Sequence, residues 1–152
     1  MSMSQIKRFA QILYRSVNHG QAKSVLLIFV VLGCALGGVL RYLLTTAVTR
    51  RFGDVFPWGT LVVNSLGSCL LGLVSGLGFH LEESWQHMDK LHATAAIGFC
   101  GGLTTFSTFS LQTLSLLSQG RKDRVAYNVF GSVLVCTVCV LVGYWFGQEV
   151  CG

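Results

Sequence analysis

The sequence predicts an all-α membrane protein of four transmembrane helices, and its composition is the first reason. Of 152 residues, 52% are hydrophobic and 11% are charged, about half the charge of a typical soluble domain. The second reason is run length, because a spanning helix needs about 20 predominantly apolar residues. Four such stretches occur, at residues 25–48, 58–79, 93–117 and 125–146. Runs such as 25–32 and 134–142 are apolar on every face, whereas the strands of a membrane barrel alternate.

Residues 1–23 precede the first span and have the pattern of an amphipathic helix. Apolar residues recur at helical spacing with basic residues between them: Ile6, Phe9, Leu13 and Val17, with Lys7, Arg8 and Arg15. An interfacial helix on an anionic surface is one interpretation, and a disordered extension is the other. The predicted organisation is an N-terminal extension at 1–23, a transmembrane domain at 24–148 and a C-terminal tail at 149–152.

The first two spans each carry one local signal. The four residues that end at Cys34 are similar to a lipoprotein cleavage site, and cleavage there would remove the first span. The apolar helix continues through Leu44, so we expect the span to be retained. The second span follows Pro57, the single proline, whose missing N–H costs nothing at a helix start.

The third span is unusual because it is rich in poor helix formers. Residues 98–110 contain an adjacent glycine pair and five hydroxyl residues, which predicts an interruption between about 101 and 108. Unwound carbonyls at bilayer depth commonly hold a cation. Phe106 and Phe109 bracket the interruption, and an anion can approach the electropositive edge of an aromatic ring.

Neutral hydrogen-bonding side chains lie in the second and fourth spans. Asn64 is midway along the second span, with Thr60 one turn before it. Asn128 and Ser132 share one face of the fourth span, and Cys136 extends that face by a turn. Uncharged donors along a path suit an anion, because each replaces a water that donated a hydrogen bond. The alternative is that each residue only joins two helices by hydrogen bonds.

The distribution of charge excludes several classes of function. Proton-coupled carriers use intramembrane acids as relays, and cation pores often use acidic rings. All six acidic residues instead fall in predicted loops or at a terminus: Asp54, Glu82, Glu83, Asp89, Asp123 and Glu149. The net charge of +5 resides at the span ends, as is usual in membrane proteins, so we expect no nucleic-acid partner. Five of the six cysteines lie within apolar spans, where they are predicted to be packing residues.

The basic residues of the loops bear on orientation. With a cytoplasmic N-terminus, five lie inside and five outside: Lys7, Arg8, Arg15, Lys23 and Lys90 against Arg50, Arg51, Arg121, Lys122 and Arg124. Orientation follows the Lys/Arg bias between loops, and here the bias is nil. The chain is therefore predicted to insert both ways and to pair antiparallel; a single orientation fixed by the N-terminal basic residues is the alternative.

Glycine spacing predicts tight helix packing. Small residues four apart let helix backbones approach closely. The chain has four such pairs: Gly33/Gly37, Gly72/Gly76, Gly98/Gly102 and Gly143/Gly147. Four short spans can barely enclose a polar path alone, so we expect an oligomer.

Three segments resemble the Fluc/CrcB family of fluoride channels. They cover residues 37–42, 57–67 and 101–109, in the family's order. The last segment, Gly-Gly-Leu-Thr-Thr-Phe-Ser-Thr-Phe, is long and unusual, and is therefore the most specific. With the fourth span, the resemblance covers roughly residues 25–147. It implies a dual-topology homodimer in the plasma membrane that passively exports fluoride through two pores.

The resemblance also implies site residues. A structural sodium ion at the dimer centre would be held by the backbone carbonyls of Gly101 and Thr104. The fluoride path would include the pore aromatics, an amide ligand, a polar track and the vestibule: Phe106, Phe109, Asn64, Asn128, Ser132, Thr108, Arg41 and Thr60. Two positions depart from the family pattern, since Gln112 stands where a glutamate is common and Cys136 where a hydroxyl is usual.

Two other functions would share the size and the span count. A small dual-topology exporter of organic cations would need an intramembrane glutamate, which the sequence lacks. A non-transporting accessory subunit would account for the glycines and the apolar spans but not for the hydroxyl-rich interruption. The sequence therefore predicts a channel and not an enzyme.

Overall fold

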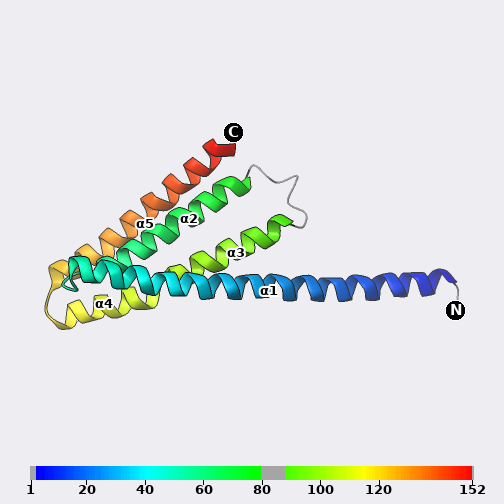
Figure 1. The fold of residues 1–152 in the computed structure, drawn as a ribbon, viewed down its shortest axis with the longest axis horizontal. Helices are drawn as coiled ribbons and strands as arrows, with labels where there is room; N and C mark the ends of the chain where they lie inside the picture. The colour runs from blue at the N-terminus through cyan, green and yellow to red at the C-terminus, as the bar shows by residue number, and fades with distance from the viewer. Residues whose placement is uncertain (1–2, 80–87, 152) are drawn as a thin grey trace.

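The computed structural model describes residues 3–79 and 88–151, and within them the side chains of residues 24, 26–77 and 96–150. This part of the chain consists of helices and the loops that join them (Figure 1). The helices are α1 (Met3–Phe52), α2 (Trp58–Phe79), α3 (Met88–Leu103), α4 (Phe106–Ser118) and α5 (Lys122–Cys151). The first, second and fourth predicted spans correspond to α1, α2 and α5, and the third is divided between α3 and α4.

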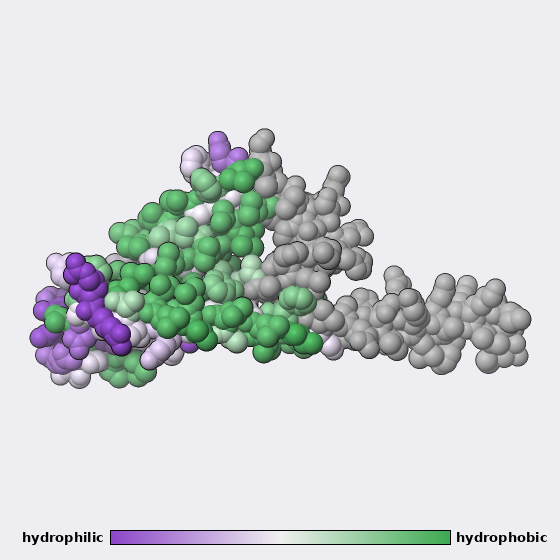
Figure 2. All heavy atoms as spheres, in the orientation of Figure 1, coloured by the Kyte–Doolittle hydropathy of each residue, from purple (hydrophilic) through white to green (hydrophobic). Residues whose placement is uncertain are grey.

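The apolar surface identifies a multi-pass membrane protein. Among the described residues, three helices are long and apolar enough to cross a bilayer: Leu26–Phe52, Trp58–Leu77 and Lys122–Val150. Figure 2 shows hydrophobic residues covering the helices, with hydrophilic ones gathered mainly at the end that carries the α1–α2 and α4–α5 loops. The exposed charged residues at that end are Arg50, Arg51, Asp54, Arg121, Lys122 and Asp123. The predicted all-α membrane fold is confirmed.

The helices associate as two close pairs, α2 with α5 and α1 with α3 (Figure 1). In the first pair, a Cβ at Gly72 would overlap the Val140 carbonyl, and one at Gly143 would overlap the Cys69 carbonyl. Because lipid is as apolar as the helices, such backbone contact replaces hydrophobic burial as the source of packing energy. We call this contact between α2 and α5 the glycine seam.

The α1–α3 pair uses glycine in the same way. A Cβ at Gly37 would overlap the Phe99 carbonyl, and one at Gly102 would overlap the Cys34 carbonyl. Gly33 is buried as well. The prediction that the four glycine pairs pack helices closely is therefore confirmed for the contacts that the structure describes.

Glycine and proline set the helix ends at the loops. Gly53 follows α1 with φ +79°, and its N–H donates to the Thr49 carbonyl at 2.8 Å. Gly120 follows α4 with φ +74°, and the next N–H, that of Arg121, reaches back to the Leu116 carbonyl at 3.1 Å. Such left-handed residues after a helix satisfy its last carbonyls. Pro57 directly precedes α2, as predicted.

Two helices, α1 and α5, extend beyond the predicted spans. α1 runs without interruption from Met3 into the first span, so no helix end separates the extension at 1–23 from the rest. The side chains of that extension lie outside the described residues, and its amphipathic role stays a prediction. α5 continues through Cys151 and takes up most of the predicted tail at 149–152. The five cysteines whose side chains are described form no disulfide.

Candidate functional site

The third predicted span is interrupted at Thr104 and Thr105, between α3 and α4. The Thr104 N–H still donates to the Cys100 carbonyl at 2.9 Å, which continues the pattern of α3. Thr105 is extended, with φ −150° and ψ 121°, and its hydroxyl accepts a hydrogen bond from the Thr108 N–H. A threonine in this N-cap position contributes about 1 kcal/mol to a helix. The predicted interruption between 101 and 108 is confirmed, and we call it the break.

Side chains from two other helices hold the backbone of the break. Asn64 of α2 accepts from the Thr105 N–H at 2.8 Å through Oδ1, and its Nδ2 donates to the Thr105 carbonyl at 3.1 Å. Arg41 of α1 donates from Nη1 to the Thr104 carbonyl at 3.1 Å. An unpartnered backbone group in the hydrocarbon region costs several kcal/mol. These bonds therefore stabilise a conformation that a single membrane helix would not keep.

The two helix ends that meet at the break have opposite polarity. α3 ends there with carbonyls that lack an intrahelical donor, and α4 begins there with N–H groups that lack an intrahelical acceptor. Such ends carry partial charges of about −0.5 and +0.5. The end of α3 therefore favours a cation, and the start of α4 favours an anion.

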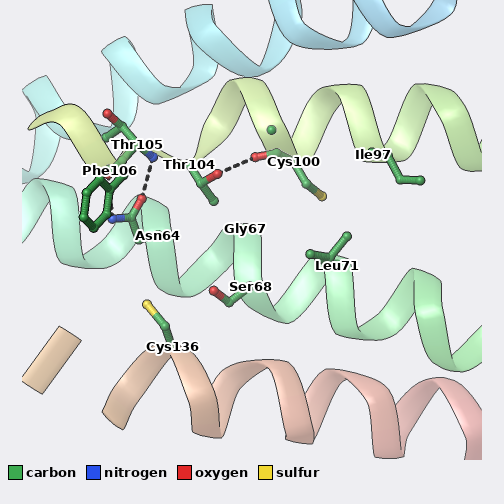
Figure 3. A pocket seen from close by; sticks show the side chains of 11 residues that line it. Asn64, Gly67, Ser68, Leu71, Ile97, Cys100, Thr104, Thr105, Phe106 and Cys136 are labelled. Carbon is green, nitrogen blue, oxygen red and sulfur yellow. Dashed lines mark hydrogen bonds between the residues drawn. The ribbon is translucent and has the colours of Figure 1, made fainter. Parts of the chain in front are cut away.

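A groove with a volume of about 440 Å³ opens beside the break. Figure 3 shows the Asn64 amide joined to Thr105 with the Phe106 ring next to it, and Cys136 facing them from α5. The lining residues are Asn64, Gly67, Ser68, Leu71, Ile97, Cys100, Gly101, Thr104, Thr105, Phe106 and Cys136. None of them is acidic or basic. The polarity of the groove therefore comes from helix ends, an amide, hydroxyls and an aromatic edge.

The two predicted pore aromatics lie together at the start of α4. The ring centroids of Phe106 and Phe109 are 5.7 Å apart. Phe106 lines the groove and is 78% exposed, whereas Phe109 is half-buried and lies outside the lining. Within one chain, the Phe106 ring, whose edge is electropositive, is therefore displayed on an open surface.

The predicted polar track on α5 divides between two neighbours. Asn128 is buried and donates from Nδ2 to the Thr113 hydroxyl of α4 at 2.8 Å. Cys136 instead lines the groove, with its sulfur 3.9 Å from the Ser65 hydroxyl of α2. Ser132, between them, is half-buried and makes no hydrogen bond within the described part of the chain.

Thr113 is a residue that the sequence analysis missed. Its hydroxyl accepts from Asn128 and donates to the Phe109 carbonyl at 2.7 Å. It follows Phe106 by seven residues, or two helical turns, so it lies on the same face of α4. That spacing is the signal that could have identified it.

The remaining predicted path residues lie outside the groove. Thr60 is 3% exposed, and its hydroxyl has no partner among the described residues. Thr108 accepts a hydrogen bond from the Thr105 hydroxyl at 3.0 Å and so belongs to the cap of α4. Arg41 lies at the break rather than in the lining. Of the predicted residues, the groove brings together Asn64, Phe106, Gly101 and Thr104.

The two carbonyls predicted to hold a cation have the free acceptor capacity for it. In a continuous helix, the Thr105 N–H would donate to the Gly101 carbonyl, but here it donates to Asn64. The surface at Gly101 is open, because a Cβ there would meet nothing within 4 Å. The Thr104 carbonyl accepts from Arg41 and keeps a second lone pair. Gly101 and Thr104 therefore fit a cation held by carbonyl oxygens.

Apolar spans, one of them broken around an uncharged groove, define a small multi-pass membrane protein built from helices. Residues 28–144 match the family described as CrcB-like protein, Camphor Resistance (CrcB). This match covers well over half of the chain, so the chain belongs to that family. It leaves out the N-terminal extension.

Relatives named as fluoride-specific ion channels agree with this assignment. The fluoride-specific ion channel FluC of Shewanella pealeana is 45% identical over 116 residues, which are 76% of this chain and 90% of that protein. The FluC protein of Phocaeicola vulgatus is 42% identical over 127 residues, 83% of this chain and 99% of the relative. FluC 3 of Brucella suis is 38% identical over 117 residues, which are 77% of this chain and 87% of that protein.

Proposed function

We propose that this protein is a fluoride-selective channel that passively exports fluoride across the plasma membrane, and is not an enzyme. The relatives named above as fluoride-specific channels support the proposal. The observation that carries it is the groove at the break. There the positive end of α4, the Asn64 amide and the Phe106 ring meet without any charged side chain.

Selectivity for fluoride follows from hydration. A small anion holds its water strongly, so a pore must offer several close donors at once. Asn64 uses one of its N–H groups on Thr105 and keeps a second for an ion. The Phe106 and Phe109 ring edges add positive potential, and Ser132 adds a hydroxyl on the facing helix. Neutral donors attract an anion without trapping it, which allows rapid flux.

An antiparallel homodimer would complete this path. The groove is open along one side, and three large aromatic side chains around it and on α5 are mostly exposed: Phe106 at 78%, Tyr127 at 72% and Phe130 at 74%. A second copy of the chain would cover such surfaces, and the balanced loop charges support opposite orientations. Labels at both termini should then react from both sides of intact cells; labelling from one side only would contradict dual topology.

A structural sodium ion at the centre of the dimer would be held by the carbonyls of Gly101 and Thr104 from each copy. The open acceptor capacity at both positions supports this assignment, as does the negative end of α3. The ion's chemistry is electrostatic: it would compensate carbonyls that no helical N–H reaches. Arg41 and Asn64 hold the same segment from the other sides.

Fluoride efflux from liposomes tests the proposed function. Purified full-length protein is reconstituted, loaded with fluoride and opened to passive flux by a potassium ionophore, while an electrode follows release. We expect rapid fluoride release without a proton gradient and no chloride release above that of protein-free liposomes. Release that requires an imposed proton gradient, or equal release of chloride, would contradict a passive fluoride channel.

A further inference from the structure

Arg41 lies where its charge acts on the carbonyl end of α3. The close contact of Gly37 with Phe99 and Leu103 brings α1 against α3. Arg41 is one turn further along α1, so it emerges at the break, half-buried. Its Nη1 donates to the Thr104 carbonyl at 3.1 Å. Neither the groove nor the described α3 and α4 side chains around the break offer a carboxylate to offset this charge.

The carbonyl that Arg41 contacts is one of the two that would hold the cation. A metal ion about 2.4 Å from that oxygen would lie within roughly 5.5 Å of the guanidinium nitrogen that is 3.1 Å from the same oxygen. Arg41 cannot lose its proton in a protein. The bound cation and Arg41 would therefore repel each other at every pH.

We propose that Arg41 makes the carbonyl site selective for monovalent over divalent cations. This inference rests on the cation site of the proposed function. Coulomb repulsion is proportional to the product of the charges. If Arg41 lowers the affinity of a monovalent cation by some factor, it lowers that of a divalent cation by the square of that factor. The same carbonyls without Arg41 would favour the more highly charged ion.

Cation binding to the purified full-length protein tests this directly. The thermal midpoint of unfolding in detergent is measured against increasing Na⁺ and, separately, Ca²⁺, with an impermeant organic cation keeping ionic strength constant. We expect Na⁺ to raise the midpoint of the parent protein and Ca²⁺ at equal concentration to leave it unchanged. A parent that binds Ca²⁺ as tightly as Na⁺, or binds neither, overturns the inference without any variant.

Two substitutions separate charge from hydrogen bonding. Arg41→Gln keeps an amide donor for the Thr104 carbonyl but removes the charge, whereas Arg41→Lys keeps the charge. For Arg41→Gln we expect the apparent affinity to rise for both ions, with a fold increase for Ca²⁺ that is about the square of the fold increase for Na⁺. Arg41→Lys should keep the preference of the parent. An unchanged ratio of Ca²⁺ to Na⁺ affinity in Arg41→Gln overturns the inference.

Fluoride efflux from the same preparation keeps this inference distinct from the proposed function. A parent that discriminates between the cations as expected but releases no fluoride would contradict the channel and leave the inference standing. A parent that releases fluoride but binds Na⁺ and Ca²⁺ equally would support the channel and contradict the inference about Arg41.

Discussion

Between α2 and α5, glycine removes side chains so that two complete helices touch backbone to backbone. Between α3 and α4, the helix is incomplete, and side chains from α1 and α2 supply partners for its backbone. Gly143 shows the first arrangement, since a Cβ there would overlap the Cys69 carbonyl. Thr105 shows the second, with both backbone groups bonded to Asn64. The packing of the glycine seam is thus sensitive to added side-chain atoms, whereas the conformation of the break is sensitive to the loss of side-chain hydrogen-bonding groups.

The largest effect is expected from an added methyl group in the glycine seam. Gly143→Ala places a Cβ against backbone, which cannot move aside as a flexible side chain would. We expect the free energy of unfolding, measured by thermal unfolding in detergent, to fall by about 3 kcal/mol or more, which is at the upper end of the cost of overpacking. Gly131→Ala is the matched control on α5, because a Cβ there meets nothing within 4 Å. Equal loss in both variants would contradict the seam's role.

At the break, removing the amide of Asn64 should reduce both flux and stability. Asn64→Ala deletes the donor that we propose for the ion, together with two hydrogen bonds to Thr105. A hydrogen bond to a charged species contributes roughly 1.5 to 3 kcal/mol, and 1.36 kcal/mol in a barrier is tenfold in rate. We expect fluoride flux in liposomes to fall about ten- to a hundredfold. The free energy of unfolding should fall by about 2 kcal/mol. Fluoride flux at the parent rate would show that Asn64 does not line the path.

Phe106→Ile sharpens the comparison, because it should slow flux with a smaller loss of stability than Asn64→Ala. The ring is 78% exposed within one chain, so its removal leaves little cavity. Losing its electropositive edge should slow fluoride about tenfold or more, while the unfolding midpoint should fall less than it does in Asn64→Ala. A variant that unfolds early and conducts normally would show that Phe106 packs rather than lines the path.

The smallest effect is expected at Cys139. It lies on α5 outside the groove lining, three residues from Cys136, which is part of the lining. Cys139→Ala should keep fluoride flux within about twofold and stability within about 0.5 kcal/mol. Because Cys139 lies on a helix that borders the groove but is outside its lining, Cys139→Ala also serves as the control for Asn64→Ala and Phe106→Ile. A large loss of flux would extend the path across α5.

The spans and the break could be predicted from sequence because both depend on local composition. Apolar run length identified α1, α2 and α5, and the glycine pair with hydroxyl residues identified the break. The partners of the break could not be predicted. Arg41 and Asn64 are 63 and 41 residues away from the atoms they contact. Such contacts depend on helix rotation, which apolar periodicity does not fix when a helix is apolar on every face.

The polar track shows a second limit of pattern reasoning. Residues four apart on a helix share a face only approximately, because each such step turns by about 40°. From Asn128 to Cys136 the turn is about 80°, and the structure directs the first toward α4 and the second toward α2. Spacing predicted a single face, but two steps were enough for the helix to turn to a different neighbour.

The length of α1 has a further structural consequence. With 50 residues and a rise of 1.5 Å per residue, the helix is about 75 Å long, more than twice the thickness of a hydrocarbon core. Arg41 sits near its far end, bonded to the break. The uninterrupted helix therefore links the part of α1 that extends beyond a hydrocarbon core, through its own backbone and Arg41, to the Thr104 carbonyl.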